Sequence, residues 1–426
     1  MNSLVQGLIQ GFFYCSIALS NKQAILLKMD FELKNFFDLD RCQLCGRCLS
    51  QCPVLGYSED KAKAEKQKLI KGEWSEVLER CKSCFSCNCF CPNQAQPYGL
   101  ILFRWFERYQ KLGIPIRALS SLPVEEKNFM EFAKRDYTRE ERVLVEEWRK
   151  NLHSELSGRE VIFVGCNGQV FPYLFNSPVF KDAVIISEPG LCCGEVYYRM
   201  GIFSRVEKLG RKLEAVYQKA KPARVIMFCL AGYNMQKNIL PKNFGIRLEP
   251  EIIYIGDWLL DRVKTGAIQF KRALNRRVAI QESCHGKALG KDFSEKPREL
   301  LRLAGAEVID LNPCREKQIC CGAADGITRF NPIDMVMGGI RQWRLAKATG
   351  ADLFVPYCAT CYLMLKMAGK FYPSFIPCVH YLELLTYAMG KDVVSLADKR
   401  AGKIMTKVML SSAGRIFSRK RIHPEG

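Results

Sequence analysis

The chain has 426 residues, of which 48% are hydrophobic and 25% are charged, an ordinary balance for a globular protein. This composition excludes global disorder, a small disulfide-stapled scaffold and a protein with many membrane spans. The chain also has 21 cysteines and a formal net charge of +20, which direct attention to metal or redox chemistry and to an anionic partner.

Residues 1–30 are predicted to be an N-terminal extension. The first 20 residues are apolar, but they lack a positive n-region and Gln6 and Gln10 interrupt them, so they make a poor signal peptide. They are also too short and too polar to span a bilayer, and Met29 is an alternative start. We therefore expect a cytoplasmic chain, with peripheral contact to the cytoplasmic membrane face as a further expectation.

Residues 31–115 hold nine cysteines within helix-favouring sequence. The pattern C-x2-C-x2-C-x3-C-P occurs twice, from Cys42 and again from Cys81. Three closely spaced thiolates can occupy three corners of a cubane, while the fourth reaches the other cluster. Zinc knuckles also use C-x2-C pairs, but a zinc site has no need of this longer run. The pattern predicts a helical ferredoxin domain with two [4Fe-4S] clusters and Cys89 as a non-ligand. The first cluster is assigned to Cys42, Cys45, Cys48 and Cys91, and the second to Cys81, Cys84, Cys87 and Cys52.

The remainder of the chain contains a repeat. Residues 116–158 lack cysteine and are rich in charged helix formers, which predicts a charged helical linker with a long exposed helix. Residues 159–265 and 275–388 then follow the same order of β-rich runs and cysteines, with helical stretches between them. The predicted fold class is mixed α+β and α/β: a helical two-cluster ferredoxin domain followed by two tandem α/β units.

Each unit contains a Cys-Cys-Gly (CCG) motif. Adjacent cysteines in an extended chain point in different directions, and the glycine lets backbone N–H groups approach a bound sulfide. In the first unit Gly232 stands at the position that matches Cys361, so we expect a degenerate structural copy and leave a cluster there as the alternative. Its cysteines are Cys166, Cys192, Cys193 and Cys229. The second unit keeps five candidate metal ligands, for which buried inert thiols are the alternative: Cys284, Cys320, Cys321, Cys358 and Cys361.

Two histidines accompany the second motif. His285 follows Cys284 directly, and His380 lies in a later apolar run. Either could bond a cluster sulfur or relay a proton. A structural role is favoured for both, because only their position argues for chemistry.

Over residues 40 to about 388 these motifs resemble the heterodisulfide reductase iron-sulfur subunit family. That family includes the ferredoxin-plus-CCG subunit of the membrane-bound enzyme, the glycolate oxidase iron-sulfur subunit and the C subunit of anaerobic glycerol-3-phosphate dehydrogenase. The resemblance implies a third iron-sulfur cluster, a cubane or non-cubane [4Fe-4S] cluster, on the five cysteines of the second CCG motif.

Two functions remain open. No dinucleotide or P-loop fingerprint is present, so a flavoprotein subunit that carries FAD is the expected electron partner. The favoured function is a heterodisulfide-reductase-like oxidoreductase subunit that passes electrons through two clusters to or from the CCG cluster. The alternative is an electron-transfer subunit of a flavin dehydrogenase, for glycolate or glycerol-3-phosphate, that delivers electrons to quinone or a membrane cytochrome without its own substrate site. Nucleic acid is not an expected partner, because no recognition motif supports it.

Residues 389–426 are predicted to form a basic amphipathic tail. From Lys391 onward this segment has nine Lys or Arg residues against three acidic ones, and its apolar residues recur at helical spacing. Such a segment is attracted to anionic lipids, so we expect contact with a membrane surface or an acidic partner. The alternative is a solvated helix.

Overall fold

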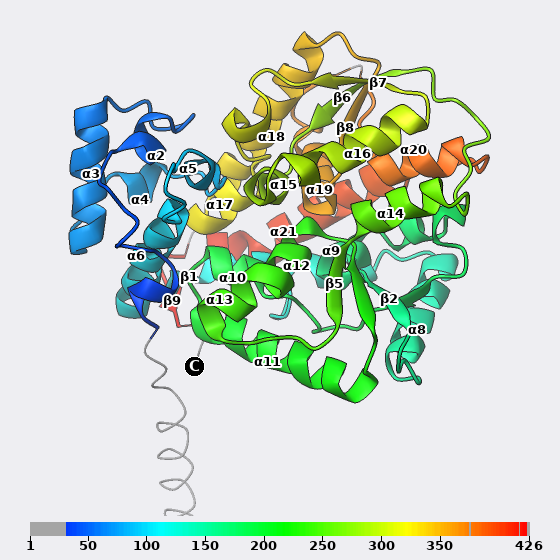
Figure 1. Cartoon of the computed structure of the whole chain (residues 1–426), viewed down its shortest axis with the longest axis horizontal. Coiled ribbons are helices and arrows are strands. Elements are labelled where there is room, and N and C mark those ends of the chain that lie inside the picture. Colours follow the sequence, from blue (N-terminus) through cyan, green and yellow to red (C-terminus); the bar gives the residue numbers. More distant parts are fainter. Residues whose placement is uncertain (1–30, 375, 417, 424–426) are drawn as a thin grey trace, which may run out of the picture.

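The structure is a computed structural model that describes residues 31–374, 376–416 and 418–423. The predicted N-terminal extension and Met29 therefore lie outside the described residues. Figure 1 shows a helical N-terminal part, in blue, beside a larger body that contains two separate sheets. Both sheets are parallel, so the mixed α/β class with parallel sheets is confirmed.

The regular secondary structure of residues 31–112 is helical. Helix α3 (Glu59–Lys71) begins where the Ser58 hydroxyl accepts a hydrogen bond from the Lys61 amide, and it ends at Gly72 in a left-handed conformation. This helix occupies the spacer between the two cysteine motifs. The other helical elements of this part are η1 (Leu33–Asn35), α2 (Arg47–Ser50), α4 (Val77–Arg80), α5 (Ser86–Cys89) and α6 (Pro97–Leu112).

The charged segment that follows does not form a simple exposed linker. Helix α8 (Arg139–Leu152) begins with a reciprocal capping box between Thr138 and Glu141, but Trp148 and Leu152 on its other face are buried. Those two apolar residues pack the helix against the first α/β unit, because a charged majority can still leave one apolar stripe. Most residues of α8 are exposed, as expected, but the helix is anchored to the first unit by these two side chains. The segment also contains η2 (Ile116–Ser121) and α7 (Phe129–Lys134).

The first sheet has the strand order β3-β2-β4-β5, and all its strands are parallel. Buried Val161 in β2 pairs with Val184 in β3 and Val225 in β4, which makes β2 central. The strands are β2 (Glu160–Phe163), β3 (Val184–Ile186), β4 (Arg224–Met227) and β5 (Glu251–Tyr254). The helical elements are α9 (Gly165–Val170), η3 (Pro172–Phe175), η4 (Pro178–Phe180), α10 (Glu195–Arg199), α11 (Phe203–Ala220), α12 (Leu230–Asn234), η5 (Met235–Ile239), α13 (Leu240–Phe244) and α14 (Ile255–Lys264).

The second sheet repeats this arrangement in the order β7-β6-β8. A parallel bridge between Phe354 and Cys378 continues it beyond β8, so the sequence repeat corresponds to two similarly ordered sheets. The strands are β6 (Arg277–Gln281), β7 (Glu307–Asp310) and β8 (Leu353–Pro356). The helical elements are α15 (Cys284–Leu289), α16 (Lys291–Leu303), η6 (Arg315–Lys317), α17 (Ala323–Arg329), α18 (Pro332–Ala348), α19 (Ala359–Ala368) and α20 (Tyr381–Ala388).

The basic tail is part of the folded core. Helix α21 (Ala397–Ile416) buries Ala397, Ala401 and Ile404 against α7, α19 and η2. The buried guanidinium of Arg400 donates to Glu141 of α8. Strand β9 (Arg421–Ile422) then pairs antiparallel with β1 (Ile114–Pro115). The apolar face that the membrane expectation required is thus packed against protein.

We expect Ile404→Ala to lower the free energy of unfolding by roughly 2–4 kcal/mol, because it removes a fully buried side chain from the core. Thermal unfolding measures this effect, and Thr406→Ala, at an exposed position of the same helix, is the control. Sedimentation with anionic vesicles should be unchanged. If Ile404→Ala abolished vesicle binding without lowering the stability, this result would show that the apolar face of α21 contacts the membrane and not the protein core.

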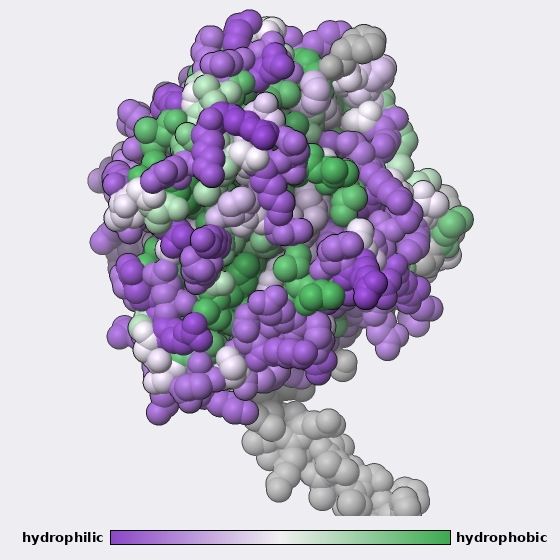
Figure 2. Space-filling model, turned by 90° about the vertical axis from the view of Figure 1, so that its right-hand side faces the viewer, coloured by the Kyte–Doolittle hydropathy of each residue, from purple (hydrophilic) through white to green (hydrophobic). Residues whose placement is uncertain are grey.

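The outer face shown in Figure 2 is mainly hydrophilic, with hydrophobic residues in small separate groups. Among the described residues, none of the helices combines the length and apolar character needed to cross a bilayer.

Candidate metal centres

The first group of thiols gathers around a small cavity beside α2. Cys42, Cys45, Cys48 and Cys91 line this cavity together with Lys66. Burial raises the pKa of the Cys48 thiol to about 11, with the Lys66 ammonium opposing the shift and the three other thiols adding to it. The Ala95 amide donates to the Cys91 sulfur at 3.3 Å. Cys45 is exposed, so this group lies at the surface.

The second group joins Cys52 of the first motif to Cys81, Cys84 and Cys87 of the second. Burial raises the pKa of Cys81, and the neighbouring Cys84 and Cys52 thiols raise it further. The pKa of Cys84 is lowered even though burial acts to raise it, because the Lys287 ammonium and the Ser86 hydroxyl outweigh burial.

Both groups fit the cluster that their pattern predicts. Each combines three thiols from one motif with the fourth thiol of the other, and backbone amides donate to sulfurs in both groups. A set of four thiols with N–H···S hydrogen bonds suits a [4Fe-4S] cluster. The assignment of these cysteines as ligands remains a prediction. Cys89 lies apart, with its sulfur directed to the backbone oxygens of Phe85 and Lys287.

The third group lies at the carboxyl ends of the strands of the second sheet. Cys284 opens α15 after β6, Cys320 and Cys321 follow β7, and Cys358 and Cys361 flank the start of α19 after β8. Parallel strands present their carboxyl ends at one edge, which brings these distant residues together. The Cys321 thiol hydrogen-bonds with those of Cys320 and Cys361, which lowers its pKa in spite of burial. All five thiols fit the predicted third site as one soft donor set.

Gly322, the glycine of this CCG motif, is required by its surroundings. Its φ is +106°, and a Cβ there would lie 2.1 Å from the Met335 carbonyl oxygen. The chain can therefore turn from the cysteine pair into α17 against α18 only with glycine at this position.

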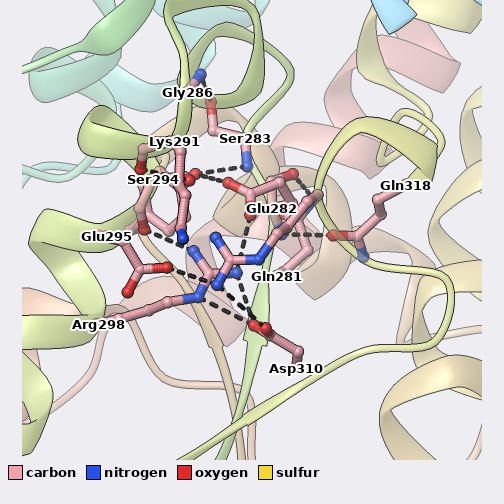
Figure 3. Close-up of polar contacts among 12 residues, drawn as sticks. Gln281, Glu282, Ser283, Gly286, Lys291, Ser294, Glu295, Arg298, Asp310 and Gln318 are labelled. Carbon is pink, nitrogen blue, oxygen red and sulfur yellow. Dashed lines mark hydrogen bonds and ion pairs between the residues drawn. The ribbon is translucent and has the colours of Figure 1, made fainter. Parts of the chain in front are cut away.

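A buried ion-pair network holds the loops that carry Cys284 and Cys320 (Figure 3). Arg298 of α16 donates to Glu282 at 2.8 Å and to Asp310 at 2.7 Å. The Glu282 amide donates to the Gln318 side chain at 2.8 Å. Because Glu282 lies just before Cys284 and Gln318 just before Cys320, this network fixes two of the thiol-bearing loops relative to each other.

The first CCG unit also gathers its four cysteines. Cys192 hydrogen-bonds with Cys166 and Cys193, and burial raises the pKa of Cys229 to about 12, with Cys358 of the other unit adding to the shift. A Cβ at Gly232 would lie 4.0 Å from the Cys193 sulfur but only 2.6 Å from the Met227 methyl. A cysteine at this position would therefore require the Met227 methyl to move. A degenerate structural copy stays the prediction for this unit.

A buried arginine that the sequence did not single out links the three parts of the chain. The Arg199 guanidinium of α10 donates to the Cys284 sulfur at 3.0 Å and to the Ser83 hydroxyl at 3.1 Å. It also ion-pairs with Glu195, whose pKa falls to about 2 although burial opposes this, because Arg199 and His285 stabilise the carboxylate. No sequence signal identified Arg199, since the second CCG motif has no arginine at the matching position.

The two histidines differ in their surroundings. His285 is buried within hydrogen-bond distance of Glu195, at 2.8 Å, and Arg199, at 2.9 Å. His380 is buried among aromatic rings that include Phe228 and Tyr362, and burial lowers its pKa to about 3. His380 is therefore neutral at pH 7 and packs as a core residue.

The second and third thiol groups share one buried cluster of side chains. Cys84 packs in one buried cluster with Cys320, Cys321 and Cys361. The buried Lys287 ammonium, next to Cys284 in α15, donates to the Ser86 hydroxyl of α5 at 2.7 Å. The ferredoxin-type part and the second CCG unit are therefore in contact where α5 meets α15.

Comparisons with known proteins identify both parts. Residues 34–99 match the 4Fe-4S dicluster domain model, and residues 278–366 match the CCG cysteine-rich domain model. These matches imply two clusters in the N-terminal part and suggest a further cluster in the second CCG unit.

Several curated oxidoreductases are similar to the chain. The D subunit of the dihydromethanophenazine:CoB-CoM heterodisulfide reductase of Methanosarcina barkeri is 25% identical over 48% of this chain and 51% of its own length. Its counterpart from Methanosarcina mazei is 23% identical over 76% of this chain and 87% of its own length. The EtfAB:quinone oxidoreductase of Syntrophomonas wolfei is 23% identical over 77% of this chain and 54% of its own length.

The chain thus spans about half the length of the first and third of these relatives. Among solved structures, a hypothetical protein from Helicobacter pylori aligns with 11% identity and a TM-score of 0.40 over 81% of this chain and 75% of that one, which is too low to establish a shared fold. With its dicluster domain and its CCG domain, the chain is a distant relative of the iron-sulfur oxidoreductases that include the D subunit of heterodisulfide reductase.

Proposed function

We propose that this chain is an iron-sulfur oxidoreductase subunit in which electrons move between the surface of the ferredoxin-type part and the second CCG unit. The single observation that carries the proposal is that Cys84 belongs to the same buried cluster of side chains as Cys320, Cys321 and Cys361. When bound, iron-sulfur clusters accept and release single electrons. The ligands would be the eight cysteines of the tandem motifs and the five of the second CCG unit.

The exposed end of this route is the first thiol group. Cys45 is exposed, and the neighbouring Leu39 and Leu44 are exposed large hydrophobic residues. A flavoprotein subunit would dock there, on the apolar surface that Leu39 and Leu44 present. The opposite end is the second CCG unit, which would hold a disulfide substrate or pass electrons to quinone or a membrane cytochrome. An acceptor in the membrane would place the chain at the cytoplasmic membrane face as a peripheral subunit.

Anaerobic analysis of iron and acid-labile sulfide in the full chain tests the proposal. Two [4Fe-4S] clusters and a third four-iron site require about twelve iron atoms per chain. About eight iron atoms per chain would mean that only the tandem motifs hold clusters, and the second CCG unit could then not be the end of the proposed route. Zinc in place of iron would overturn the proposal entirely.

Arg199 is expected to set the potential of the third site. A buried positive charge 3.0 Å from the Cys284 sulfur stabilises the reduced, more negative state. A charged hydrogen bond contributes about 1.5–3 kcal/mol, and for a one-electron couple its loss corresponds to a change of roughly 60–130 mV in the midpoint potential. Arg199→Gln should therefore lower the midpoint potential of this site by that amount in an EPR-monitored redox titration.

Two controls accompany this measurement. Arg199→Lys keeps the charge and should recover most of the shift, and Arg211→Gln removes an exposed arginine from α11 and should cause none. An unchanged potential in Arg199→Gln, with normal iron content, would show that the guanidinium has only a structural role.

A further inference from the structure

A mostly apolar cavity of about 230 Å³ lies beside the second CCG unit. Its walls come from η2, α17, α18, α19 and α21, segments that are far apart in the sequence. Arg117 is the one charged residue in the described lining, and its guanidinium donates to the Phe330 carbonyl oxygen at 2.6 Å. A ligand with several negative charges would lose its hydration here and meet too few positive side chains to replace it. The cavity therefore suits an uncharged, largely apolar molecule.

One layer of side chains separates the cavity from the third thiol group. Ala323 in the lining follows Cys321-Gly322, and Ala359 lies between Cys358 and Cys361. Met364 lines the cavity and belongs to the same buried cluster as Cys320, Cys321 and Cys361. A molecule in the cavity would therefore lie next to the proposed metal ligands.

Two polar side chains mark this inner part of the cavity. The Thr360 hydroxyl donates to the Asn167 amide oxygen at 2.8 Å, and the Asn167 amide nitrogen donates to the Cys229 sulfur at 3.2 Å. An amide nitrogen has two hydrogens, so Asn167 has the capacity for a second hydrogen bond to a ligand carbonyl. The pair thus joins the cavity to the thiols of both CCG units.

The outer part of the cavity reaches the surface. Phe371 and Met409 belong to the lining, and each is more than half exposed. Methionines are flexible and polarisable, so they adapt to flat rings and to hydrocarbon tails. The methionines of the lining are Met335, Met364, Met367, Met405 and Met409.

From this geometry we propose that the cavity binds a quinone with an apolar tail. The ring would lie toward Asn167 and Thr360 with a carbonyl oxygen facing the amide, and the tail would leave between Phe371 and Met409. This proposal rests on the proposed function and names its substrate class. Two electrons would arrive singly from the iron-sulfur route, with a reduced flavin of the partner as their source. Two protons from water would complete the quinol, converting both ring C=O bonds to C–OH.

Equilibrium dialysis of decylubiquinone against the anaerobically prepared full chain tests binding directly. Val336→Trp fills the cavity from α18, and Met405→Trp fills it independently from α21. Each should weaken binding by about tenfold or more, because the bulky ring removes space and apolar contacts. Ile333→Trp is the matched control, since Ile333 lies in the same helix as Val336 but is exposed and outside the lining.

A second readout follows the reoxidation of the prereduced protein. Decylubiquinone should reoxidise Val336→Trp about tenfold more slowly than the unmodified chain, whereas ferricyanide should reoxidise both at the same rate. Iron content and EPR spectra must be unchanged in the variants, which separates this proposal from the proposed function. Normal clusters with no decylubiquinone binding, or with binding that neither tryptophan weakens, would overturn the quinone assignment and leave the electron route standing. If the unmodified chain lacked the third iron site, both the quinone assignment and the proposed function would be overturned.

Discussion

Cys321→Ser is expected to abolish the EPR signal of the third site and to remove about four of about twelve iron atoms, while both ferredoxin-type clusters remain. The Cys321 thiol is the contact between Cys320 and Cys361, and its pKa is lowered by hydrogen bonds from both. A serine hydroxyl is a poor ligand for iron compared with a thiolate, so the site loses its central donor. Iron analysis and EPR on the anaerobic full chain measure both effects.

Two matched variants make this result specific. Cys314→Ser replaces a half-buried cysteine of the same unit that lies outside the thiol group, and it should change neither iron content nor EPR. Cys193→Ser probes the first CCG unit and should also leave every signal in place. Equal loss of a cluster in Cys193→Ser and Cys321→Ser would show that the four thiols around Gly232 hold a cluster of their own.

Arg298→Met is expected to lower the free energy of unfolding by about 3–5 kcal/mol. Both Arg298 and its partner Glu282 have side chains only 1% exposed, so the substitution leaves a buried carboxylate without its cation. Burial already raises the pKa of Glu282, and Arg298 is the main group that opposes this. Thermal unfolding of the anaerobic protein, monitored by circular dichroism, measures the loss.

The stability loss should be specific to the buried pair. Arg302→Met lies one turn further along α16, where the side chain is about half exposed, and it should change stability by less than about 1 kcal/mol. Adding Glu282→Gln to Arg298→Met removes the unpaired charge and should recover part of the loss. A stability of Arg298→Met equal to that of Arg302→Met would contradict a supporting role for the network in Figure 3.

The cysteine pattern predicted which thiols lie together, and their role as cluster ligands stays a prediction. Each tandem motif occupies a short loop and helix, so its spacing alone predicts which thiols come together, and both expected groups of four gather in the structure. The residues around the CCG thiols could not be predicted in the same way. Arg199 and Lys287 reach those thiols from other parts of the fold, and nothing local in their sequence marks that contact.

Two segments pack against the rest of the chain more closely than predicted, for a common reason. Their charged residues dominate the composition, but a few apolar side chains decide where they pack. In α8 these are Trp148 and Leu152, and in α21 they include Ala401 and Ile404, all of them buried. Amphipathic periodicity predicts that one face is covered, but it does not distinguish a membrane or solvent from another part of the same chain.

Freeze-quench EPR during one-electron reduction tests the proposed route most directly. Electrons from a photogenerated deazaflavin radical should appear first in the ferredoxin-type clusters and afterwards in the third site. Cys45→Ser, which alters the exposed thiol of the first group, should slow the reduction of the third site by about tenfold or more, because that group is the entry point. Reduction of the third site at an unchanged rate in Cys45→Ser, or ahead of the ferredoxin-type clusters in the unmodified chain, would contradict the proposed route.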